Sequence, residues 1–280
     1  MFKNVLVGVD GRPGGRDAIA LARRLSDPGA RLTLAFVRSG EKAEDLADSE
    51  ELLERERSAA DLEAELLSVV SLSPGRGLHE QAEQQGADLL VVGSCSHGTF
   101  GRAMLGDDTR AALNGAPCAV AVAARDYAER HTAISNLGVA YNRSPESKTA
   151  LALAQELAAP AKAKVHALEV ISLPPVAYGG LMSPPIGEVI NGMVKEANDR
   201  MKELADVDGR AVYGLAGEEL ARFGDELDLL VVGSRGYGPV RRLVSGSTSN
   251  YLERHARCSL LVLPRTDPGP ASNPASSSGD

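Results

Sequence analysis

The chain has 280 residues, and its 38 Asp and Glu outnumber its 30 Lys and Arg, which gives a net charge of -8. This balance argues against broad binding to nucleic acids or anionic membranes, because neutralising phosphates requires clustered Lys and Arg. No run of 18 apolar residues and no signal-peptide cleavage site is apparent. The 3 cysteines are an odd number, and they do not have the spacing of zinc ligands. We therefore expect a cytoplasmic protein without a disulfide framework.

The first half of the chain alternates short apolar runs with helix-like patterns. Runs that are apolar on both faces are typical of parallel strands buried between helices. In chain order, we predict a strand over 4–9, a helix over 14–26, a strand over 31–37, a helix over 41–65, a strand over 66–72, a helix over 75–85, a strand over 87–92, a helix over 107–114 and a strand over 119–123.

The second half repeats the first. Residues 88–94 and 228–234 both read DLLVVGS, and PGGRDAIALARRL at 13–25 is answered by PESKTALALAQEL at 145–157. A repeat of this length is a whole domain rather than a solenoid unit. The second set of predicted elements is a strand over 137–141, a helix over 146–159, a strand over 165–171, a helix over 186–205, a strand over 210–213, a helix over 217–224, a strand over 227–232, a helix over 247–256 and a strand over 259–263.

This alternation predicts an α/β fold with two tandem five-stranded parallel sheets, doubly wound in the Rossmann-like manner, with helices on both faces. We place the first copy at 1–127 and the second copy at 131–265. Residues 266–280 are rich in Pro, Ser and Gly and are predicted to be a disordered tail. Ligands of such folds bind beyond the carboxyl ends of the strands, where the strand order reverses.

A glycine-rich loop follows the fourth strand of the second copy. Gly233, Gly236 and Gly246 allow backbone amides to approach an anion, and Ser247 then begins a predicted helix whose free amides and dipole favour a phosphate. The hydroxyl groups of Ser247, Thr248 and Ser249 can cap this helix or donate to phosphate oxygens. An ordinary capped surface loop is the competing interpretation.

The spacing Gly233-x2-Gly236-x9-Gly246-Ser247 resembles the ATP-binding motif G-x2-G-x9-G-(S/T) of universal stress proteins. The resemblance extends over nearly the whole chain as two tandem copies. It implies a five-stranded α/β fold and a site for ATP, with or without Mg²⁺. In this site, adenine lies near the first two strands and the phosphates lie in the glycine loop. It also implies that the last strands of two domains pair.

The first copy departs from this motif. It keeps Gly93, but Ser96 replaces the second glycine, and Gly106 is followed by Asp107 and Asp108. Carboxylates at a helix N-terminus occupy the electrostatic position of a phosphate. They repel a polyphosphate by about 1 kcal/mol or more per close charge pair. We therefore expect weak or no ATP binding in the first copy, unless a divalent cation bridges these aspartates to phosphate.

The nucleoside side shows the opposite asymmetry. Asp10 follows the first strand of the first copy, and the resemblance places this aspartate close to the nucleoside. The second copy has Asn142 there, followed by the bulky Arg143. Asn142 keeps its hydrogen-bonding capacity and loses the charge. The intact loop is the larger share of the motif, so nucleotide binding is predicted mainly in the second copy, with Asp10, Gly93 and Gly106 forming a weaker site.

These residues predict a nucleotide-dependent sensor that responds to stress through an unknown protein partner. No catalytic group or metal ligand is identified, although slow ATP hydrolysis stays open. The alternative is a nucleotide-independent scaffold in which both sites are degenerate. In that scaffold the strands over 119–123 and 259–263 pair, so that the two copies form a dimer-like unit within the chain. The sequence does not decide whether two such chains also form a homodimer. A weaker third reading is an enzyme acting on a phosphorylated metabolite. We expect Cys118 and Cys258, at equivalent positions, to be buried core residues.

Overall fold

The computed structural model describes residues 1–40, 42–94, 111–130, 133–172, 186–234 and 247–264. Each half alternates strands and helices as the apolar pattern predicts. The elements of the first half are β1 (Phe2–Gly8), α1 (Pro13–Leu25), β2 (Ser26–Arg38), α2 (Ala43–Ala59), β3 (Glu65–Val70), α3 (Pro74–Gln85), β4 (Leu89–Gly93), β5 (Ala119–Ala123) and η1 (Ala128–Arg130).

The second half has the same alternation of strands and helices. They are β6 (Asn136–Ala140), α5 (Pro145–Ala158), β7 (Lys164–Ile171), α6 (Ile186–Met201), β8 (Asp208–Tyr213), α7 (Ala216–Phe223), η3 (Gly224–Glu226), β9 (Leu229–Gly233), α8 (Ser247–His255) and β10 (Ser259–Leu263). Of the helix predicted over 107–114, residues 107–110 lie outside the described residues, and residues 111–113 are helical.

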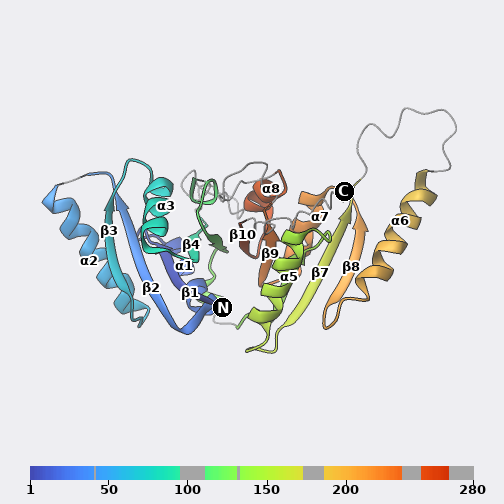
Figure 1. The fold of residues 1–280 in the computed structure, drawn as a ribbon. Helices are drawn as coiled ribbons and strands as arrows, with labels where there is room; N and C mark the ends of the chain where they lie inside the picture. The colour runs from blue at the N-terminus through green and yellow to red at the C-terminus, as the bar shows by residue number, and fades with distance from the viewer. Residues whose placement is uncertain (41, 95–110, 131–132, 173–185, 235–246, 265–280) are drawn as a thin grey trace, which may run out of the picture.

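The ten strands form one sheet in the order β3-β2-β1-β4-β5-β10-β9-β6-β7-β8. Within each copy all paired strands are parallel, as predicted. The two copies join through β5 and β10, which pair antiparallel, with Ala121 opposite Leu261. The expected pairing of the last strands is thus confirmed as a contact within the chain. Figure 1 shows the result: β3 with α2 lies at one end of the sheet, and β8 with α6 lies at the other.

Helices cover both faces of the sheet and enclose two aliphatic cores, each of which runs across the junction. On one face α1, α2, α5 and α6 bury residues such as Leu53 and Leu157 against the strands. On the other face α3, α7 and α8 contribute residues such as Leu78, Phe223 and Leu252. Strand residues alternate between these two cores, which explains their continuous apolar runs. No helix among the described residues is long and apolar enough to cross a membrane.

Three predicted boundaries differ from the structure by about four residues or more, and backbone conformation or strand pairing explains each. The helix predicted over 41–65 ends at Ala59, because the chain reverses at Asp61 with a left-handed φ of 46°. The helix predicted over 186–205 ends at Met201, and Asp206 then adopts a φ of 57°. Strand β2 begins at Ser26 rather than at residue 31, because its pairing with β1 resumes after a register shift. A non-glycine residue at positive φ does not change the spacing of the apolar residues around it. The apolar periodicity therefore does not reveal where these two helices end.

The junction between the copies also contains polar contacts. The Ala124 amide, which follows β5, donates to the buried Ser259 hydroxyl of β10 at 3.1 Å. The carboxylate of Asp17, on α1, accepts from the amides of Asp126 at 3.0 Å and Ala128 at 2.8 Å. Asp17 is only 4% exposed, and burial raises its pKa. These contacts fix the segment that leaves the first copy.

Candidate nucleotide site

A cleft opens at the carboxyl ends of β1, β2 and β4 in the first copy. Its volume is about 440 Å³, and its lining includes the predicted site residues Asp10 and Gly93. Val37, Leu78 and Val92 form its apolar wall. The cleft lies where the strand order reverses between β1 and β4, which is the position that doubly wound folds use for ligands. The buried Ser94 hydroxyl, at the cleft, has no hydrogen-bond partner within the described residues.

The loops after β1 and β6 have the same hydrogen-bonded turn. In the first copy the amide of Arg12 donates to Asp10 Oδ1 at 3.0 Å. In the second copy the amide of Ser144 donates to Asn142 Oδ1 at 3.1 Å. Aspartate and asparagine are equivalent in this local role, because both offer a side-chain oxygen to the amide two residues later. The replacement therefore keeps the shape of the loop and removes one negative charge.

Arg143 occupies the position of Gly11 and has the same left-handed backbone, with φ values of 66° and 76° respectively. Its guanidinium Nε lies 3.8 Å from the Oε1 atom of Glu169, on β7. Arg200 of α6 lies 3.9 Å from the same oxygen. The bulky side chain of Arg143 is thus paired with a nearly buried carboxylate. Sequence reasoning missed this cluster, because its three members come from three separate elements.

The first glycine of the motif has a packing role in both copies. A Cβ atom on Gly93 would collide with the carbonyl oxygen of Gly14, at the start of α1. A Cβ atom on Gly233 would lie 2.8 Å from the Cβ atom of Glu146, at the start of α5. The helix N-terminus lies so close to the strand end that only glycine fits here. Packing alone therefore explains this glycine, whether or not a ligand binds. The amides of Ser94 and Ser234 then bond to the last strand, at Ala123 and Leu263.

Of the glycine-rich loop in the second copy, the structure describes only the two ends. Strand β9 ends at Gly233, and α8 begins at Ser247 and includes Thr248 and Ser249 in its first turn. Because α8 follows a parallel strand, its N-terminus lies on the carboxyl side of the sheet, as the prediction requires. Gly236 and Gly246 lie outside the described residues. So do Ser96, Gly106, Asp107 and Asp108 of the first copy.

The two described cysteines have no catalytic features. Cys118 and Cys258 directly precede β5 and β10, and both are buried and free, as expected. Burial raises the pKa of each thiol to about 12. A thiol with this pKa is almost wholly protonated near neutral pH and is therefore a poor nucleophile. Cys95 is outside the described residues.

Together, the strand order and the repeated halves define a tandem doubly wound α/β protein, with a cleft at the switch point of the first copy. The Universal stress protein family matches residues 1–124 and 134–264, and the chain belongs to this family. Universal stress protein A homolog 1 of Coxiella burnetii is 29% identical over 133 residues, which are 44% of this chain and 92% of that protein.

Solved structures share the fold over almost the whole chain. A universal stress protein from Archaeoglobus fulgidus has a TM-score of 0.66 and 18% identity, covering 94% of this chain and 98% of its own. A second structure, from Pseudomonas aeruginosa, has a TM-score of 0.65 and 18% identity, covering 94% of both chains. At this identity the likeness extends to the fold alone.

Proposed function

We propose that this protein is a cytoplasmic stress-response sensor that binds ATP or another adenine nucleotide mainly in its second copy, residues 131–265. The observation that carries the proposal is the complete G-x2-G-x9-G-S spacing between the end of β9 and the start of α8. Backbone amides at a helix N-terminus bind phosphate through both hydrogen bonds and the helix dipole. Family membership is consistent with this site.

In the proposed site, Gly233, Gly236 and Gly246 form the phosphate loop, and Ser247, Thr248 and Ser249 donate their hydroxyl groups. Asn142 lies on the nucleoside side, where its loop has the same turn as that of Asp10. Val170 is the counterpart of Val37, which lines the cleft of the first copy. The first copy, residues 1–127, retains the cleft, but it has Asp107 at the position of Ser247. We therefore assign Asp10, Gly93 and Gly106 to a weaker site.

Calorimetric titration of the full chain with ATP and Mg²⁺ tests the assignment. Ser247→Asp gives the second copy the residue that the first copy has at this position. Repulsion of the triphosphate by the new carboxylate should weaken binding at least tenfold. Asp10→Asn is the matched control, because it gives the first copy the residue of the second, and it should change the affinity less than twofold. Equal affinities for Ser247→Asp and the unaltered chain would contradict the proposal.

The scaffold remains the second candidate, and one observation favours it. Arg143, Glu169 and Arg200 form a charged cluster at the end of β7, beside the nucleoside position. If this cluster blocks the site, neither ATP nor another adenine nucleotide should bind to the full chain. The β5–β10 junction would then be the functional element, presenting both copies to a protein partner in one fixed arrangement.

A further inference from the structure

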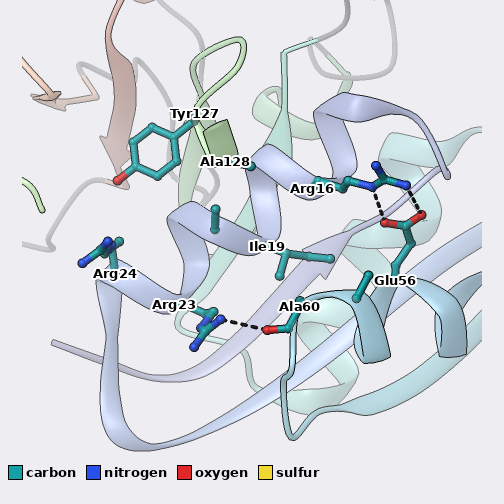
Figure 2. Close-up of a pocket in the computed structure, with 10 residues that line it drawn as sticks. Arg16, Ile19, Arg23, Arg24, Glu56, Ala60, Tyr127 and Ala128 are labelled. Atoms are coloured by element: carbon teal, nitrogen blue, oxygen red, sulfur yellow. Dashed lines mark hydrogen bonds and ion pairs between the residues drawn. The ribbon is translucent and has the colours of Figure 1, made fainter. Parts of the chain in front are cut away.

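A second cavity lies on the outward face of α1, between the end of α2 and the turn at Tyr127. Its volume is about 580 Å³, within the range typical of small-molecule sites. Figure 2 shows the cavity with Arg16 and Glu56 on one side and Tyr127 and Arg24 on the other. It shares no lining residue with the cleft that contains Asp10. The cavity is therefore separate from the proposed nucleotide site.

The charge of the lining is positive, although the protein is acidic. Arg16, Arg23 and Arg24 line the cavity together with one carboxylate, Glu56. Glu56 has a side chain that is 1% exposed, and it accepts from Arg16 Nε at 2.9 Å, which fixes Arg16 in place. Arg23 donates to the carbonyl oxygen of Ala60 at 2.8 Å, at the end of α2. Glu56 balances only one of the three arginines, so the lining keeps two positive charges without an acidic partner among the lining residues. Guanidinium groups suit the geometry of phosphate and carboxylate groups.

The rest of the lining is small and mostly apolar. Ile19 packs into the core beneath, and four alanines leave space above it: Ala20, Ala59, Ala60 and Ala128. The hydroxyl oxygen of Tyr127 is buried without a hydrogen-bond partner in the parts of the chain that the structure describes. The cavity therefore offers an apolar floor and cationic sides.

The second copy keeps only one of these three positive charges. The equivalents of Arg16, Arg23 and Arg24 on α5 are Lys148, Gln155 and Glu156. Glu156 instead pairs with the amino group of Met1. Because α5 forms the same helix in the same fold, the fold does not require arginine at these positions. The basic lining is a specific property of the first copy.

We propose that this cavity binds a small organic anion, in which a phosphate or carboxylate group is attached to an apolar body. Arg23 and Arg24 hold the anionic group, and the apolar body lies over Ile19 and Ala20. Arg16 is held by Glu56 and closes the far side. This site is independent of nucleotide binding at the carboxyl edge of the sheet.

Methyl-labelled NMR of the full chain, titrated with phenyl phosphate and separately with octanoate, tests the proposal. A probe in the cavity shifts the Ile19 methyl signals, whereas a probe in the nucleotide cleft shifts those of Leu78 and Val92. We expect saturable shifts at Ile19 with at least one probe. Phenyl phosphate alone would identify a phosphate site, and octanoate alone a carboxylate site.

The variant R23Q/R24E carries the residues that α5 has at these positions, so it should fold with an unchanged methyl spectrum elsewhere. We expect at least tenfold weaker probe binding. Lys148→Gln removes a charge from the equivalent α5 position, and it should bind within twofold of the unaltered chain. The proposal is overturned if neither probe shifts Ile19 at millimolar concentration, or if R23Q/R24E binds as tightly as the unaltered chain.

Discussion

Replacing Asp17 by asparagine removes one of the two acceptors that fix the segment after β5. The carboxylate oxygens accept from the amides of Asp126 and Ala128 at 3.0 and 2.8 Å. An asparagine has one oxygen, so its NH₂ group must face the second amide, and one buried donor loses its partner. The expected loss is about 1–3 kcal/mol of unfolding free energy. Urea denaturation followed by circular dichroism measures this loss. The control variant is Asp61→Asn, at an exposed turn, which should cost less than about 0.5 kcal/mol.

The pH dependence of this loss tests the stated cause. Burial is the largest influence on Asp17 and raises its pKa above the ordinary 3.8, against the opposing effect of the two amides. The folded state therefore retains the proton over a pH range in which the unfolded state has lost it. The contribution of Asp17 to stability decreases as the pH rises through this range. The penalty for Asp17→Asn should be smaller at pH 7 than near pH 4, and a larger penalty at pH 7 would refute the reasoning.

Three further predictions concern the junction, the thiols and the glycine contact. Leu261→Ala should cost about 2–5 kcal/mol in urea denaturation, because the fully buried Leu261 lies on β10 at the junction; a cost below 1 kcal/mol would contradict the packing. Cys118 and Cys258 should not react with Ellman's reagent at pH 8 in the native protein, because their pKa values are about 12; rapid labelling of either would show that the thiol is accessible. Gly93→Ala should lower the melting temperature by several degrees through collision with α1, whereas Gly29→Ala, in open space, should not; equal effects would remove the packing argument.

The strands and their assembly could be predicted from sequence because their signal is local. Runs such as Leu89–Gly93 are apolar on both faces, and burial between two helical layers is what selects that composition. The helix ends were harder to predict. Asp61 and Asp206 reverse the chain in the left-handed conformation, and nothing in the surrounding hydrophobic pattern marks them.

The candidate site was predictable only in part, for a physical reason. The repeat and the glycine spacing identify the loop, and Asp10 and Gly93 do lie together at one cleft. However, the sequence does not separate the two roles of Gly93, which packs against α1 and also lines the cleft. The cluster around Glu169 depends on contacts between distant elements, and such contacts have no local signature.

The most direct test of nucleotide binding in the second copy is a methyl NMR titration of the full chain with ATP and Mg²⁺. Val170 and Val232 report on the second copy, and their counterparts Val37 and Val92 report on the first. The proposal predicts saturable shifts at Val170 and Val232 at nucleotide concentrations that leave Val37 and Val92 unchanged. Shifts confined to Val37 and Val92, or no shifts at millimolar ATP, would contradict it.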